Sequence, residues 1–168
     1  MRTALVAAAV LALAGCRPPA PPAPKPGPPP PVGNAVGQSA PAFSLHDSKG
    51  APYVESGFVG RKAQLLVFGT TACPMCQAKV ADVDAVRQKR GGEVEVAAVL
   101  LSETPEKAEK YASEFKAGFR MVLDPRNISI ALFKLGNYPH FVLIDKRGVI
   151  RYTGQQLPGD ALIEEAAR

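Results

Sequence analysis

The 168-residue sequence contains no tryptophan, three cysteines and two histidines. No run after residue 16 is long and apolar enough to cross a membrane, which excludes a spanning helix beyond that point. The formal charge of +5 is misleading, because from residue 37 onward 17 basic residues stand against 15 acidic ones. Without clustered basic residues, nothing indicates nucleic acid as a partner. The chain has no internal repeat and suffices for one domain with a real core.

The N-terminus has the pattern of an export signal. Arg2 precedes an apolar run at residues 4–14, which is typical of a signal peptide over residues 1–16. The last four residues of this stretch, Leu-Ala-Gly-Cys, resemble the bacterial lipobox, and this resemblance makes Cys16 the lipidated first residue of the mature protein. An ordinary signal peptide with an unrelated cysteine is the alternative. Arg17 follows where an aspartate often marks inner-membrane retention, so the choice between inner and outer membrane stays open.

Proline dominates residues 17–36, which we interpret as a disordered linker. Such a chain favours extended polyproline II and, at about 3.1 Å per residue, reaches up to ~60 Å from a bilayer. A proline-rich recognition ligand is the alternative. The folded domain is predicted to occupy residues 37–168.

Two cysteines lie where an apolar stretch gives way to a helical pattern. Residues 65–68 are short and apolar, as in a buried strand, and a break at residues 69–72 leads to Cys73 and Cys76. Free N–H groups at a helix start stabilise a thiolate, so the pKa of Cys73 is expected below the free value of about 8.5. Pro74 suits the first helical position, and Cys76 can attack a mixed disulfide at Cys73. The alternative, a purely structural disulfide, is weak because a disulfide that closes so small a loop adds little stability.

The remaining pattern alternates strands with helices. A helix follows the cysteines up to the glycines at 91–92, and a four-residue hairpin turn lies at residues 145–148. The chain is therefore predicted to be α/β, with a central mixed sheet and helices on both faces. The further expected strands are residues 40–45 as an edge strand, 64–69 as a central strand, 93–101, 119–123 and 149–153, and the further helices are 104–116, 127–135 and 160–168.

Three segments resemble the membrane-tethered thioredoxin-like proteins of the TlpA and ResA type, within the broader redoxin group. They are residues 37–45, residues 65–76 and residues 138–154, and together they span about 118 residues. The resemblance implies a thioredoxin-like fold with Cys73 and Cys76 as the catalytic pair. It also implies that Pro139 is a cis-proline facing the cysteines, with the Tyr138 backbone available to a bound substrate strand. An ordinary trans-proline at a strand start is the alternative.

The sequence departs from that family near the cysteines. Ala72 replaces the usual tryptophan, which removes a flat apolar surface beside the sulfur. Lys79 stands where relatives often have a proton-relaying glutamate; it favours the thiolate if it faces the sulfurs, and otherwise points to solvent. His140 could hydrogen-bond a sulfur or be a solvent-facing residue on an edge strand. Met75 is expected to be an exposed apolar contact for partners.

These features predict an extracytoplasmic, membrane-anchored thiol–disulfide oxidoreductase that faces the periplasm of a bacterium. The Cys73 thiolate attacks a disulfide and Cys76 resolves the mixed disulfide. The resemblance implies exported disulfide or dithiol proteins as partners, apocytochrome c among them, together with a membrane electron donor or acceptor. We expect no cofactor and no resident metal ion.

Two other functions remain open at this stage. A Cu(I) chaperone of the same fold could use both thiolates with His140 or Met75, although copper-delivering relatives have a wider cysteine spacing. A peroxiredoxin-like peroxidase would use Thr70, three residues before Cys73, as its threonine. Leu66 stands where that motif has proline, however, and no downstream arginine is identifiable.

Overall fold

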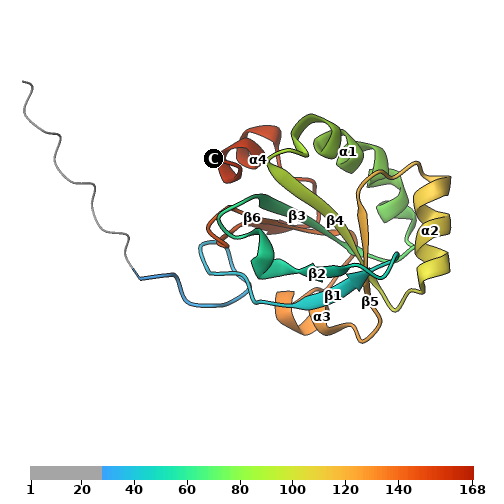
Figure 1. The fold of residues 1–168 in the computed structure, drawn as a ribbon, viewed down its shortest axis with the longest axis horizontal. Coiled ribbons are helices and arrows are strands. Elements are labelled where there is room, and N and C mark those ends of the chain that lie inside the picture. Colours follow the sequence, from blue (N-terminus) through green and yellow to red (C-terminus); the bar gives the residue numbers. More distant parts are fainter. Residues whose placement is uncertain (1–27) are drawn as a thin grey trace, which may run out of the picture.

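The computed structural model describes residues 28–168 (Figure 1). The predicted signal peptide and the lipidation site Cys16 lie outside the described residues, as does the first part of the predicted linker. Within residues 28–168, no helix combines the length and the apolar character needed to cross a membrane.

A seven-stranded mixed sheet forms the centre of the molecule, in the order β2-β1-β5-β4-β3-β6-β7. Strands β3, β4 and β5 run parallel, and every other pairing in the sheet is antiparallel. The strands are β1 (Ser44–Asp47), β2 (Pro52–Val54), β3 (Ala63–Gly69), β4 (Val94–Leu101), β5 (Arg120–Asp124), β6 (His140–Ile144) and β7 (Ile150–Gly154). The helices are the 3-10 helix η1 (Glu55–Phe58) and the α-helices α1 (Pro74–Arg90), α2 (Pro105–Glu114), α3 (Ile128–Phe133) and α4 (Asp160–Ala166).

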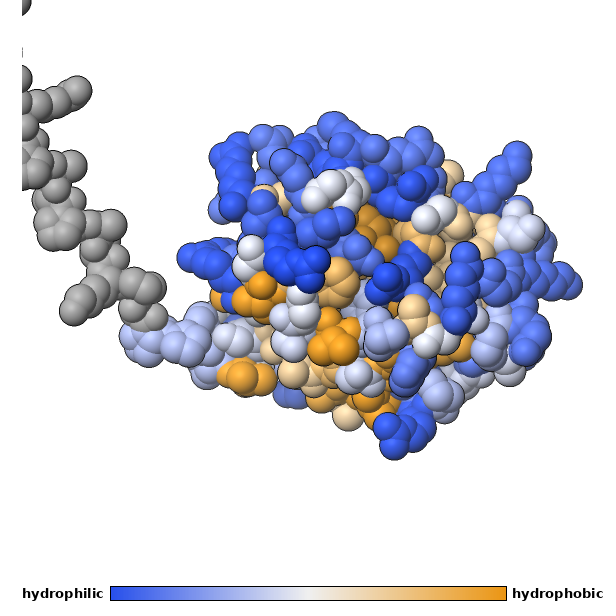
Figure 2. Space-filling view, viewed as in Figure 1, coloured by the Kyte–Doolittle hydropathy of each residue, from blue (hydrophilic) through white to orange (hydrophobic). Residues whose placement is uncertain are grey.

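Helices cover both faces of the sheet, as predicted (Figure 1). Helices α1, α2 and α4 supply Val83, Tyr111 and Ile163 to one core. On the other face, Phe133 of α3 packs with Phe43 and with other residues of a second core. The side with α1 and α4 is the more hydrophilic in Figure 2, and apolar residues gather on the side of β1, β2 and α3.

Strand β3 separates the two cores, which confirms the predicted central strand. All seven of its residues are buried. Its side chains alternate, so that Leu65 and Val67 belong to the first core and Leu66 and Phe68 to the second. Because β4 and β6 flank it on either side, the end of β3 is held firmly, and the chain leaves it toward the cysteines.

The predicted edge strand at residues 40–45 is wrong in place and in extent. The strand begins at Ser44 and lies between β2 and β5, so it is not an edge. The preceding residues pair elsewhere, with the Ala40 N–H donating to the Gly148 carbonyl. The edge strand on this side of the sheet is β2, a three-residue strand that begins with Pro52, and proline is tolerated there because an edge N–H needs no partner strand.

Hydrogen bonds continue upstream of residue 37. The Ser39 N–H donates to the Pro31 carbonyl at 3.0 Å, and the Gly33 N–H donates to the Ser39 carbonyl at 3.0 Å. Gly37 donates in turn to the Ile150 carbonyl at 2.8 Å. The last residues of the predicted linker are therefore hydrogen-bonded to the domain along the start of β7.

Candidate functional site

Cys73 is the N-cap residue of α1. Its backbone is extended (φ −80°, ψ 110°), and its Sγ accepts a hydrogen bond from the Cys76 N–H at 3.1 Å. Pro74 occupies the first turn, where a missing N–H leaves nothing unpaired. The Cys73 sulfur thus sits in the position of an N-cap acceptor, where the partial positive charge of the helix start stabilises a thiolate.

A disulfide joins Cys73 to Cys76, with Cα atoms 5.2 Å apart. The two residues differ in burial: Cys73 is half-buried, whereas Cys76 is only 7% exposed. Met75, between them, is 61% exposed, in line with the predicted apolar contact at the surface. A protein that approaches the site therefore meets Cys73 first, with Cys76 behind it.

Gly69, the last residue of β3, makes room for the buried sulfur. A Cβ atom at this position would lie 2.6 Å from the Cys76 Sγ, closer than real Cβ atoms come to any neighbour. Glycine is thus required by the close approach of the helix to the strand. The sequence predicts only a break after the strand at this residue, because its pattern does not encode how closely the helix approaches the strand.

The segment that contains Pro139 precedes a strand paired with β3, and the end of β3 leads to the cysteines. Strand β6 pairs antiparallel with β3, and His140 at its start is opposite Phe68 at the end of β3. The Tyr138–Pro139 peptide bond is cis, which confirms the predicted isomer. The roles of Tyr138 and Pro139 in positioning a substrate remain predictions.

The predicted modulators have other partners. The His140 ring is within 2.8 Å of the Thr153 hydroxyl, and burial lowers its pKa. It lies on β6, an internal strand, so the alternative of a solvent-facing residue on an edge strand is wrong. The Lys79 ammonium donates to Asp82 at 3.2 Å. The Thr70 carbonyl accepts a hydrogen bond from the Cys73 N–H at 3.3 Å.

Thr71, in the loop before the cysteines, is held from two sides. Its N–H and its hydroxyl both donate to the Glu103 carboxylate, at 3.0 and 2.7 Å. The side-chain amide of Gln77, on α1, donates to the Thr71 carbonyl at 2.8 Å. Sequence reasoning missed Glu103, because 32 residues separate it from Thr71 and no local motif marks the contact.

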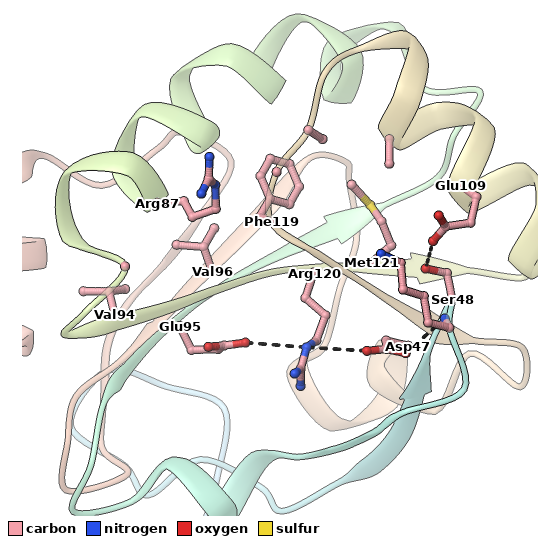
Figure 3. Close-up of a pocket in the computed structure, with 15 residues that line it drawn as sticks. Asp47, Ser48, Arg87, Val94, Glu95, Val96, Glu109, Phe119, Arg120 and Met121 are labelled. Carbon is pink, nitrogen blue, oxygen red and sulfur yellow. Dashed lines mark hydrogen bonds and ion pairs between the residues drawn. The ribbon is translucent and has the colours of Figure 1, made fainter.

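No group of three or more His, Cys, Asp or Glu residues that could hold a metal ion occurs within residues 28–168. A groove of about 470 Å³ lies elsewhere, beside the starts of β4 and β5 (Figure 3). There the Arg120 guanidinium lies between Asp47 and Glu95, at 3.6 and 3.7 Å. This groove is remote from the cysteines, which follow the opposite end of the parallel strands.

Comparison with known proteins agrees with this geometry. The family model described as Redoxin matches residues 35–162. The chain is 32% identical to the thiol-disulfide oxidoreductase ResA of Geobacillus kaustophilus over 120 residues, which is 70% of this chain and 67% of that protein. It is 28% identical to the methylamine utilization protein MauD of Paracoccus denitrificans over 124 residues, or 73% of this chain and 60% of MauD.

Solved structures show the same fold. The thioredoxin domain of a thiol-disulfide oxidoreductase from Bacteroides vulgatus superposes with a TM-score of 0.66 at 25% identity, covering 78% of this chain and 94% of that one. A thiol:disulfide interchange protein of the thioredoxin family from Chlorobium tepidum gives a TM-score of 0.68 at 19% identity, over 80% and 99% of the two chains. The sheet and the helices thus follow a known fold.

Proposed function

The chain belongs to the Redoxin family and is a thiol–disulfide oxidoreductase with a thioredoxin-like fold, and from this premise we propose that it exchanges disulfides with exported proteins from a membrane-anchored position outside the cytoplasm. The observation that carries the proposal is the Cys73 sulfur at the N-cap of α1, half-buried and within reach of the buried Cys76.

The exchange proceeds in two steps. The Cys73 thiolate attacks one sulfur of a substrate disulfide, forming a mixed disulfide and releasing one substrate thiolate, which takes up a proton. The Cys76 thiolate then attacks the Cys73 Sγ, so the second substrate sulfur leaves with its electron pair. Two electrons have passed to the substrate, and the protein is left with the Cys73–Cys76 disulfide of this structure. Oxidation of a substrate dithiol is the same sequence in reverse.

The segment of Tyr138 and Pro139 positions the substrate. It precedes β6, whose first residue, His140, is paired with Phe68 near the end of β3, and this neighbourhood supports the proposal. An extended substrate segment can hydrogen-bond to backbone groups there, as a strand added to an edge does. Such recognition depends little on the side chains of the substrate, which suits exported proteins of varied sequence.

Anchoring comes from the N-terminal sequence. Acyl chains on Cys16 hold the protein to a bacterial membrane facing the periplasm, and stable attachment takes more than one chain. The proline-rich linker holds the domain away from the bilayer, where it meets exported proteins such as apocytochrome c. A second protein in the membrane supplies or accepts the two electrons that restore the cysteine pair. Metabolic labelling with a radioactive fatty acid tests the anchor: wild-type protein is labelled, and Cys16→Ser is not.

Trapping tests the exchange step. In cells that make Cys76→Ser, mixed disulfides through Cys73 are expected to accumulate and to disappear on reduction. The matched control is Cys73→Ser, which keeps Cys76 and forms few such adducts because the remaining sulfur is buried. Equal adduct formation by the two variants, or none by Cys76→Ser, contradicts the proposed order of attack.

A further inference from the structure

Glu103 connects the chain after β4 with the active-site loop. Its side chain is only 7% exposed, although it lies between a strand and the start of α2. One carboxylate oxygen, Oε1, accepts both the N–H and the hydroxyl of Thr71, two residues before Cys73. An acidic side chain thus holds the loop that carries the attacking sulfur.

The second oxygen of this carboxylate has no hydrogen-bond donor. Glu103 Oε2 is fully buried and unpartnered among the described residues. The Lys107 ammonium forms an ion pair with it at 3.8 Å without a hydrogen bond, from a side chain that is 67% exposed, so solvent screens most of this compensation. Leaving a buried charged oxygen without a hydrogen-bond donor is costly, and an uncharged side chain could accept the two Thr71 bonds equally well. The site therefore retains a negative charge that the loop contacts alone do not require.

The charge is close enough to act on the cysteines. Glu103 Oε1 is 3.0 Å from the Thr71 nitrogen. Because Cys73 follows two residues later and consecutive Cα atoms are about 3.8 Å apart, the carboxylate lies within about 12 Å of the Cys73 backbone. The two other groups considered as modulators of the pair have partners of their own, Lys79 with Asp82 and His140 with Thr153.

We propose that Glu103 is a positioning residue that holds the cysteine loop through Thr71 and whose charge makes the Cys73–Cys76 couple more reducing. The inference rests on the proposed role of Cys73 as the attacking thiolate. A negative charge nearby disfavours the thiolate, which exists only in the dithiol form, and leaves the neutral disulfide unaffected. The dithiol is destabilised relative to the disulfide, so the protein donates electrons more readily.

Equilibration of the full-length protein with glutathione redox buffers, read by thiol trapping, tests the inference. Glu103→Gln keeps an oxygen for Thr71 and removes the charge. Its equilibrium constant is expected to shift about three- to tenfold toward the dithiol, the range for one charge at about 10 Å. For a two-electron couple, this raises the reduction potential by about 15 to 30 mV. The control Glu114→Gln removes the same charge from the exposed end of α2 and leaves the constant unchanged within error.

A second variant keeps the inference testable if Glu103→Gln does not fold. Thr71→Val keeps the Glu103 charge and removes the hydroxyl that partly compensates it. The equilibrium constant with glutathione therefore shifts toward the disulfide, and by less than in Glu103→Gln. If Glu103 is merely structural, Glu103→Gln lowers the unfolding temperature and leaves the constant unchanged, and the inference is overturned. No shift, or a shift toward the dithiol, in Thr71→Val also overturns it. Failure of the wild-type protein to equilibrate with glutathione at all overturns the proposed function and this inference with it.

Discussion

Replacing Gly69 by alanine should strain the oxidised protein more than the reduced one. The new Cβ would lie 2.6 Å from the Cys76 Sγ, about 1 Å closer than a comfortable contact of roughly 3.5 Å or more. The backbone cannot move away easily, because Gly69 is paired with Leu100 in the centre of the sheet. Overpacking of this kind costs about 1 to 3 kcal/mol.

The redox state decides how the strain is relieved. In the disulfide form, the Cys76 sulfur is bonded to Cys73 and cannot turn away. In the dithiol form, it can rotate about χ1 into another rotamer. If reduction relieves about half of a strain energy of about 2 kcal/mol, the reduction potential of the Cys73–Cys76 couple rises by about 20 mV. The melting temperature of the oxidised form should fall by about 5 to 8 °C, and that of the reduced form by about half as much.

Calorimetry of both redox forms and equilibration with glutathione measure these changes. Gly92→Ala is the matched control, since a Cβ there has no atom within 4 Å, and it should leave both quantities nearly unchanged. Equal destabilisation of the two redox forms would show that the Cys76 sulfur is not the atom that requires glycine. A Gly69→Ala protein as stable as wild type would refute the close approach itself.

Three further predictions concern stability. Hydrogen bonding from Arg87 lowers the pKa of Asp84 to about 2 from 3.8. This carboxylate therefore stabilises the fold above pH 3.8 by at most about 2 kcal/mol, and the effect is lost as pH falls toward 2. In Asp84→Asn, the urea midpoint of unfolding should change less with pH across that range than in the wild type. The buried Tyr53 hydroxyl donates to Gln64 at 2.8 Å, so Gln64→Leu should lower the unfolding free energy by about 2 to 3 kcal/mol, and adding Tyr53→Phe should recover part of it. Burial lowers the pKa of His140 below 6.5, so the stability from its neutral form is present above pH 6.5 and lost as pH falls below it. His140→Gln should remove that part of the slope between pH 7 and 5, and an unchanged slope would exclude this residue as its source.

The fold was largely predictable from local patterns. The apolar run of β3, the Thr104 N-cap with Pro105 at the start of α2, and the turn that ends at Gly148 each follow from local chemistry, and each is present. The misplaced edge strand shows the limit of such reasoning. The alternation at residues 40–45 indicates a half-buried segment. It does not indicate which strands lie beside this segment, because those strands, at residues 52–54 and 120–124, are set by the rest of the chain.

The site was predictable where its residues adjoin in sequence. The cysteine pair at the start of α1 and the cis bond before Pro139 were predicted, the second by resemblance alone. The Glu103 contact and the close approach of Gly69 to Cys76 were not. Both depend on how the elements pack around the loop, and no spacing in the sequence encodes that distance.

The rate at which iodoacetamide modifies the reduced protein, followed against pH and mapped by mass spectrometry, tests the attacking sulfur directly. Cys73 should react first, with an apparent pKa below the free value of about 8.5, since its sulfur caps α1. Cys76, which is buried, should react far more slowly. Modification of Cys76 first, or a Cys73 midpoint at or above 8.5, would contradict a thiolate stabilised by the helix start.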